Sequence, residues 1–231
     1  MRVFFLRHGE SLSNAAPHTL ALPEEEGDRL SERGEQQAES AAERVADLGI
    51  ERIVCSPLGR ARQTAAVVAK YAGRRPEIWD WIHELREPSD YASLPKGEQE
   101  LRRWSNRMAN NEDPEFAEGD GESFADLVRR VERTREQLVA DDVDRTLLVG
   151  HGIFCRFMFA MTLFGDEFTP RHAAWLWRIG SLNCGLSTFD HVAGGGSNDP
   201  ADISGWRCVT WMAPTIGPEL ATGTGGVGPG A

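Results

Sequence analysis

The sequence predicts an α/β fold, a three-layer α/β/α sandwich with a mainly parallel central sheet and an inserted cap segment. Short runs rich in Val, Ile, Leu and Phe are typical of strands that are buried on both faces. Helical patterns alternate with these runs at a spacing that fits right-handed βαβ units. Residues 80–120 break this alternation with prolines and charges, which indicates an insertion.

The first part of the chain supplies three expected strands and two expected helices. The apolar, β-prone run from Met1 to Leu6 predicts a central strand. Ser31 is a good N-cap for a helix whose apolar face carries Ala38, Ala41, Ala42, Val45 and Leu48. The other elements expected here are a strand at Arg52–Cys55, a helix from Gly59 to near Gly73, and a short strand around Glu77–Trp79.

The segment 80–120 contains only a short helical stretch, near Gln99–Ala109, and we expect it to cover the edge of the sheet. Regular structure then resumes. The elements expected next are a helix opened by a capping box of Ser123 and Asp126, a buried strand at Arg145–Val149, and an apolar helix at Ile153–Phe164.

The C-terminal part predicts two strands, around Asn183–Asp190 and Trp206–Met212, joined by a Gly-rich loop as a closing hairpin at the sheet edge. Trp175 and Trp177 stand two residues apart, as strand residues on one face do, so we expect them in the core. Residues 217–231 are mostly Gly, Ala, Thr and Pro, which predicts a disordered tail. The folded unit is therefore expected to be one domain, residues 1–216.

The charge balance argues against binding to large anionic partners. The 231 residues include 36 acidic and 25 basic side chains, a formal net charge of −11. Such a surface opposes attraction to nucleic acid or an anionic membrane. Any small anion must therefore be gathered locally. All basic residues but Lys70 and Lys96 are arginines, the type suited to bidentate phosphate binding.

The cysteines predict neither a metal site nor a disulfide framework. They are widely spaced and no Cys-x-x-Cys pair occurs, so we expect reduced and mostly buried thiols. No apolar stretch is long enough for a membrane span, and because the Arg-His-Gly motif starts at Arg7 we expect no removable leader before it. The expected location is the cytoplasm, and the expected assembly is a monomer or homodimer.

Two histidines and two arginines follow the ends of predicted parallel strands. Arg7 and His8 follow the first strand, Arg60 lies one turn into the helix after the second, and His151 follows the strand at 145–149. Parallel strands bring these side chains to one edge of the sheet, where α/β proteins bind ligands. The set could neutralise a phosphoryl group and leave one imidazole nitrogen free to attack phosphorus.

The motifs around these residues resemble those of the histidine phosphatase superfamily, also called the phosphoglycerate mutase-like family. The matches run in order along most of the chain: Arg7-His8-Gly9-Glu10-Ser11 with Asn14, Asp28-Arg29-Leu30-Ser31 with Gly34 and Gln37-Ala38, Ser56-Pro57-Leu58 with Arg60-Ala61 and Thr64-Ala65, Gly121-Glu122-Ser123, Gly150-His151-Gly152 with Arg156, and Asn183.

The resemblance implies a role for each site residue. His8 would be the nucleophile that becomes phosphorylated, while Arg7, Arg60 and His151 would surround the phosphoryl oxygens. Gly152 would lie in the same phosphate site, and Asn14 would add a polar contact. His151 would supply positive charge if it is protonated.

A proton donor for the leaving oxygen is also expected, because the family takes one from a carboxyl group after the third strand. Glu84 and Glu87 are the two candidates, and the leucine-x-glutamate pattern favours Glu87. Such a carboxyl group beside arginines needs apolar cover to stay protonated.

The resulting hypothesis is a phosphomonoesterase that acts on a small phosphorylated metabolite through a phosphohistidine on His8, with no metal and no cofactor. A phosphoglycerate mutase is the first alternative, but it needs extra cations for a second acidic group, and the cap segment offers only the pair Arg102-Arg103. A catalytically silent phospho-ligand-binding scaffold is the second alternative. The presence of Arg7, His8, Arg60 and His151 together argues against a silent scaffold. We expect residues 80–120 to determine the substrate specificity.

Overall fold

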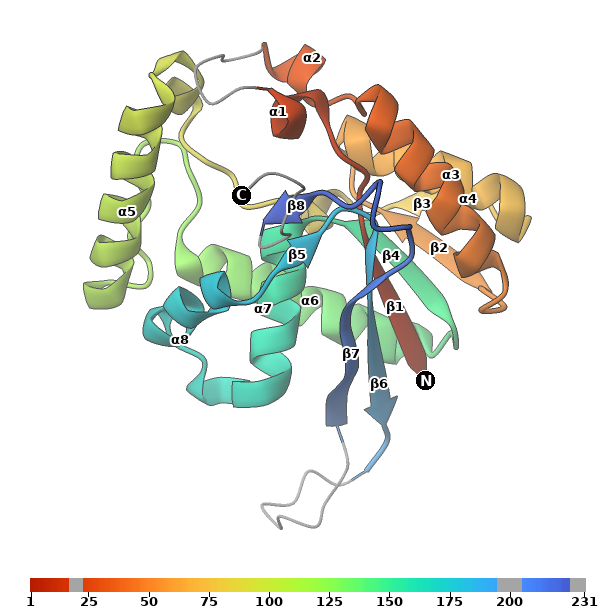
Figure 1. The fold of residues 1–231 in the computed structure, drawn as a ribbon. Coiled ribbons are helices and arrows are strands. Elements are labelled where there is room, and N and C mark those ends of the chain that lie inside the picture. The colour runs from red at the N-terminus through yellow and green to blue at the C-terminus, as the bar shows by residue number, and fades with distance from the viewer. Residues whose placement is uncertain (17–22, 195–204, 225–231) are drawn as a thin grey trace.

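The computed structural model describes residues 1–16, 23–194 and 205–224. Within these residues the centre of the molecule is a six-stranded sheet in the order β3-β2-β4-β1-β6-β7 (Figure 1). Its strands are β1 (Arg2–Arg7), β2 (Arg52–Cys55), β3 (Pro76–Ile78), β4 (Thr146–Gly150), β6 (Gly185–Val192) and β7 (Gly205–Pro214). A second, two-stranded sheet pairs β5 (Ser181–Leu182) with β8 (Gly223–Thr224).

Four neighbouring strands of the central sheet run parallel. β1 pairs with β4, β4 with β2, and β2 with β3, all in parallel. β6 and β7 continue the sheet beyond β1 as an antiparallel hairpin, as predicted, although residues 195–204 of its connection lie outside the described residues. Because β4 enters between β1 and β2, the carboxyl ends of these three strands lie side by side.

Helices cover both faces of the sheet, which confirms the α/β class (Figure 1). The helices of more than six residues are α3 (Glu32–Ala46), α4 (Gly59–Ala72), α5 (Lys96–Glu112), α6 (Phe124–Asp141) and α7 (Gly152–Phe164). The shorter ones are α1 (Leu12–Ala15), α2 (Glu24–Gly27) and α8 (Pro170–Trp175). Single 3-10 turns occupy Asp80–Ile82, Ser89–Ser93, Gly165–Glu167 and Leu176–Arg178.

The structure confirms the predicted ends of three helices, at Ser31, Gly73 and Ser123. The Ser31 side chain accepts a hydrogen bond from the N–H of Gly34 at the start of α3. α4 ends at Gly73, whose φ of 62° is in the left-handed region that favours glycine. Ser123 opens α6 with the expected capping box.

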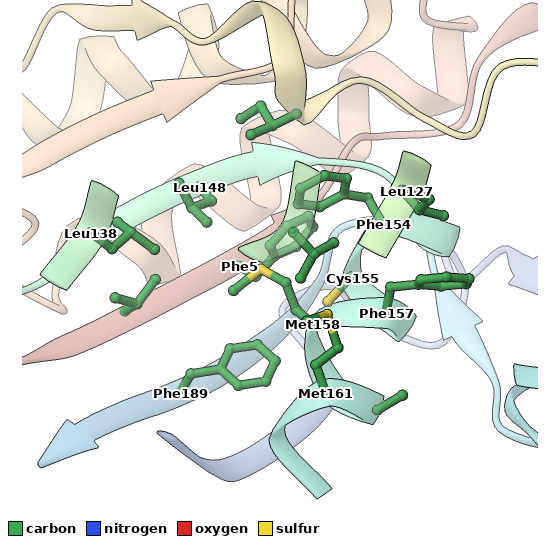
Figure 2. Close-up of a cluster of buried hydrophobic side chains, with 14 of the residues drawn as sticks. Phe5, Leu127, Leu138, Leu148, Phe154, Cys155, Phe157, Met158, Met161 and Phe189 are labelled. Atoms are coloured by element: carbon green, nitrogen blue, oxygen red, sulfur yellow. The ribbon is translucent and has the colours of Figure 1, made fainter. Parts of the chain in front are cut away.

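Alternate residues of β1 point into two separate hydrophobic clusters. Val3 and Phe5 pack with α6 and α7 on one face, and Phe4 and Leu6 pack with α3 and α4 on the other. Figure 2 shows the first cluster, in which Phe5 lies among side chains of α6, α7 and β6. Each fully buried side chain of this size contributes roughly 1.5–3 kcal/mol to folding. Burial on both faces explains why β1 is apolar at every position from 3 to 6.

The cap segment differs from its prediction. Its helix α5 packs against α8 and stands on the side of the molecule away from β2 and β3, so it does not cover the sheet edge (Figure 1). Trp175 and Trp177 lie in α8 and the turn after it, not in a strand, and they are 56% and 44% exposed. Their spacing of two residues therefore did not indicate core packing.

The predicted disordered tail is wrong for residues 217–224. β8 pairs with β5, and the amide of Asn183 donates to the carbonyl of Thr222 (2.8 Å). The side chain of Gln37, fully buried on α3, donates to the carbonyl of Leu220 (2.6 Å). These backbone hydrogen bonds hold the segment without a large apolar area, which composition could not reveal. Residues 225–231 lie outside the described residues.

None of the described helices combines the length and the apolar character that crossing a bilayer requires. The four cysteines are unpaired thiols, as expected, and three of them are buried.

Candidate active site

The two histidines of the sequence motifs meet at the carboxyl ends of β1 and β4. Their ring centroids are 5.1 Å apart, and the rings are tilted by 58°. His8 is 3% exposed and His151 is fully buried. Arg60 reaches the same place from the first turn of α4, directly after β2. The predicted convergence of three parallel strand ends is therefore confirmed.

His8 is held with its Nε2 atom facing the site. Its Nδ1 atom lies 2.6 Å from the carbonyl oxygen of Gly9, and because a carbonyl can only accept, Nδ1 carries the proton. Nε2 consequently carries the lone pair, and it accepts a hydrogen bond from Nε of Arg60 (3.1 Å). Burial lowers the pKa of His8 well below its ordinary value, and the charges of Arg60 and Arg7 lower it further. The imidazole is therefore neutral, as a nucleophile must be.

His151 is also neutral in this structure. Burial lowers its pKa well below its ordinary value, and the charge of Arg60 and the neighbouring His8 act in the same direction. Its Nε2 atom is hydrogen-bonded to Oγ of Ser56 (2.7 Å). The lowered pKa disfavours the positive charge that His151 would supply if it were protonated. A dianion beside it would favour the protonated form.

Arg7 and Arg60 are partnered in different ways. Arg7 donates from Nη1 to the carbonyl of Ser181, and burial lowers its pKa to about 10. Arg60 forms an ion pair with Asp28 (2.5 Å), whose other oxygen accepts from the amide of Gly59. Asp28 therefore fixes the direction of the Arg60 side chain at the start of α4.

Gly152 has no side chain, and this leaves open the space beside the Arg7 guanidinium group. A Cβ atom at this position would lie 3.0 Å from Oγ of Ser181 and 3.4 Å from Nε of Arg7. Nη1 of Arg156 is also 3.4 Å from that point. Because Gly152 is the first residue of α7, its surroundings combine a helix N-terminus with two guanidinium groups, a suitable environment for an oxyanion.

Three buried polar atoms around this space have no hydrogen-bond partner within the described part of the chain. They are Nε of Arg7, Nδ1 of His151 and Oγ of Ser181. Buried polar groups are nearly always hydrogen-bonded, and an unpartnered one costs about 1–3 kcal/mol. Several such atoms in one place are the mark of a site whose partners come with a ligand.

The glutamate that joins this site is Glu84. Its carboxylate accepts hydrogen bonds from the amides of Ile153 (3.1 Å) and Phe154 (3.2 Å), the residues that follow Gly152 in α7. Glu87 instead forms a two-pronged ion pair with Arg103 of α5. The leucine-x-glutamate pattern therefore pointed to the carboxylate that the cap uses for its own ion pair, because sequence does not show which side chain faces α7.

Asn14 serves as a helix cap. It forms a capping box with Ser11 at the start of α1, and its side-chain oxygen lies 3.4 Å from the amide of Ser11. The phosphate contact expected of Asn14 stays a prediction.

Sequence reasoning assigned no role to several residues that shape the site. Asp28 and Ser56 stood in the quoted motifs, and their positions beside the candidate arginine and histidine could have suggested a supporting role. Ser181 carried no signal, since no motif surrounds it. Its contact with Arg7 joins positions 174 residues apart in the chain.

Most of the chain matches a known protein family. The family model of the histidine phosphatase superfamily (branch 1) matches residues 3–199. Two proteins with the name probable phosphoglycerate mutase GpmB are similar along nearly their full length. The one from Erwinia tasmaniensis is 30% identical over 94% of this chain and 93% of its own length, and the one from Yersinia enterocolitica is 32% identical over 89% and 90%.

Solved structures of phosphatases share the fold. A mycobacterial glucosyl-3-phosphoglycerate phosphatase, solved in complex with VO3, superposes with a TM-score of 0.70 at 26% identity, covering 92% of this chain and 99% of its own. A phosphoserine phosphatase from Entamoeba histolytica superposes with a TM-score of 0.69 at 19% identity, covering 92% and 96%. The latter identity is low enough that it supports the fold alone.

Proposed function

Because this chain belongs to the histidine phosphatase superfamily (branch 1), a family of enzymes, we propose that it is a phosphomonoesterase that works through a phosphohistidine on His8. One observation carries the proposal. The neutral His8 presents the lone pair of Nε2 to a pocket in which Arg7, His151 and Ser181 have unpartnered polar atoms. A nucleophile and an oxyanion site in one place are what phosphoryl transfer requires.

In the first step, Nε2 of His8 attacks the phosphorus of the bound ester. The N–H of Arg60 that now bonds to Nε2 moves to a phosphoryl oxygen as the ester arrives. The P–N bond forms and the ester P–O bond breaks, while the leaving oxygen takes a proton from Glu84. The positive charge that develops on the ring is stabilised by the Gly9 carbonyl, which keeps its hydrogen bond from Nδ1.

The phosphoryl oxygens are stabilised by the groups that surround Gly152. Arg7, Arg60 and His151 supply side-chain donors, and the amide of Gly152 lies at the helix N-terminus. Charge stabilisation on these oxygens is the main contribution that a protein makes to phosphoryl transfer.

In the second step, a water molecule attacks the phosphohistidine and gives a proton to the Glu84 carboxylate. The P–N bond breaks, inorganic phosphate leaves, and His8 returns to its neutral form. We propose Glu84 for both proton transfers because its carboxylate is bound at the start of α7, whereas Glu87 is held by Arg103 in the cap. The proposed cycle uses only protein groups and water.

A phosphoglycerate mutase is the second candidate because relatives at 30–32% identity have that name. A mutase must hold a substrate with a second acidic group. The adjacent cap arginines that the sequence offers for this purpose are already paired, Arg102 with Asp90 and Glu118, and Arg103 with Glu87. This pairing favours the hydrolase.

The proposal is tested by assaying phosphate release from p-nitrophenyl phosphate and from sugar and nucleotide phosphates in the presence of a chelator. We expect turnover, and an alkaline quench during turnover should trap an acid-labile phosphoryl group on His8. Absence of any phosphate release overturns the proposal. Interconversion of 3- and 2-phosphoglycerate that depends on a bisphosphate primer, at a rate above hydrolysis, would favour the mutase instead.

A further inference from the structure

A cavity of about 400 Å³ lies beside the phosphate pocket, between α5, α7, α8 and the segment 85–91. Ile153 and Arg156 of α7 line it. These residues also adjoin the pocket, since the amide of Ile153 binds Glu84 and Nη1 of Arg156 faces Gly152. The cavity therefore adjoins the pocket at the start of α7, where Glu84 is bound, and its size is that of a small-molecule site.

The wall of the cavity is mainly aromatic and aliphatic. Its large side chains are Tyr91, Trp104, Met108, Phe157, Leu176 and Trp177. Trp104 and Trp177 are 54% and 44% exposed, although tryptophan side chains are mostly buried in folded proteins. Such surfaces gain free energy when a flat apolar group is placed on them.

Most of the charged side chains of this wall are already engaged. Arg103 is paired with Glu87 and Glu100, while Glu122 is paired with Arg130. The guanidinium groups of Arg107 and Arg156 lie over the ring of Trp177, at 5.3 and 5.1 Å from its centroid. This arrangement disfavours a compact ligand with several charges and favours one that extends the aromatic stack.

Two polar atoms in the wall lack a partner within the described residues. The amide oxygens of Asn106 and Asn111 are both inaccessible and unbonded. An amide oxygen needs an N–H or O–H donor, so these two are a second and independent sign of a ligand.

We propose that this cavity binds the alcohol part of the substrate, and that the substrate class is a phosphomonoester of an alcohol with a flat apolar ring and a hydrogen-bond donor. This inference rests on the proposed phosphomonoesterase activity. The phosphoryl group occupies the pocket at Gly152, the ester oxygen lies toward Glu84, and the ring stacks between Trp104 and Trp177.

The test compares three primary alkyl esters, which avoids the advantage that aryl phosphates have as good leaving groups. The probes are 2-(indol-3-yl)ethyl phosphate, ethyl phosphate and 3-phosphoglycerate, and the measurement is kcat/KM for phosphate release. We expect the indolylethyl ester to exceed each of the other two by roughly 100-fold, from the burial of the ring. Equal values, or the highest value for 3-phosphoglycerate, overturn the inference.

A pair of variants on α5 connects this preference to the cavity. Trp104→Ala should lower the ratio of the indolylethyl to the ethyl value by about tenfold, because it removes one side of the stack. Leu101→Ala is the matched control, since Leu101 is 62% exposed on the same helix and does not line the cavity. An unchanged ratio in Trp104→Ala contradicts the proposed position of the ring.

These measurements separate the two proposals. If no ester is hydrolysed, p-nitrophenyl phosphate included, the phosphomonoesterase itself is wrong. If esters are hydrolysed without a preference for the ring, the activity stands and only the substrate class is wrong.

Discussion

The phosphate pocket and the cavity beside it are built in opposite ways. In the pocket, strand ends place the central groups: Arg7 ends β1, His8 follows it, His151 follows β4, and all three are less than 10% exposed. In the cavity, α5 contributes exposed side chains such as Trp104 and forms ion pairs with Glu87, Asp90 and Glu118. A site fixed by the sheet suits a reaction that proteins of one fold share. A wall of surface side chains can differ between such proteins and so fit different substrates.

The arginines of the two regions show the same difference. Arg7 has no carboxylate partner within the described residues and keeps Nε unbonded, so its donors are available to a phosphoryl group. Arg102 of the cap contacts three carboxylates and thereby stabilises the cap instead. The number of arginines in a region is therefore a poor guide to anion binding, and their partners are a better one.

The largest expected effect comes from removing the nucleophile. His8→Ala should lower kcat for p-nitrophenyl phosphate by at least about 10⁴-fold, because it removes the group proposed to form the covalent intermediate. Initial rates and a thermal unfolding curve measured together separate lost chemistry from lost folding. His172→Asn, at the surface cap of α8, is the control and should keep the wild-type rate. A variant at His8 that keeps full activity contradicts the mechanism.

The next effect distinguishes the two glutamates. Glu84→Gln should lower kcat for ethyl phosphate by roughly 10²–10⁴-fold, because an alkoxide needs a proton as it leaves. The same variant should act much less on p-nitrophenyl phosphate, whose leaving group needs no proton. Glu87→Gln provides the comparison, since its carboxylate is paired with Arg103. A larger loss of kcat for ethyl phosphate in Glu87→Gln than in Glu84→Gln would show that Glu87 is the proton donor, as the sequence pattern predicted.

Arginines in the two regions should respond unequally to the same substitution. Arg7→Lys should lower kcat/KM by about 10²-fold, because lysine cannot keep the Ser181 contact and also reach a phosphoryl oxygen. Arg102→Lys, among the exposed ion pairs of the cap, should change kcat/KM by less than about twofold. Losses of equal size in both variants would show that the cap cations take part in phosphate binding.

The sequence predicted the pocket far better than the cavity, for a physical reason. His8, Arg60 and His151 each follow a strand whose apolar run and cap signals are local, and the parallel pairing of the strands then brings them together. The cavity depends on how α5 meets α8, two helices about 70 residues apart whose contact leaves no periodic pattern. The preference for Glu87 over Glu84 and the omission of Ser181 have a similar reason, since Glu84 and Ser181 each act through a backbone group distant in the chain.

The smallest effect is on stability, and it comes from the two buried neutral histidines. Folding lowers their pKa values well below the ordinary value of 6.5, whereas the unfolded chain takes up protons near that value. The folded state therefore has its full stability above about pH 6.5, and loses it as the pH falls toward the lowered pKa values. The loss is about 1.4 kcal/mol per pH unit for each histidine.

Urea unfolding at a series of pH values between about 7.5 and 5, which extends to both sides of the point near pH 6.5 below which stability falls, measures this slope. His151→Gln should reduce it by about 1.4 kcal/mol per pH unit, since it removes one of the two histidines but can keep a hydrogen bond to Ser56. Val131→Ala is the matched control, because it weakens the core of α6 without removing a titratable group, and so should lower the whole curve without changing its slope. A slope that His151→Gln leaves untouched would mean that His151 is protonated in the folded protein, and that the pocket carries a positive charge there before any phosphate binds.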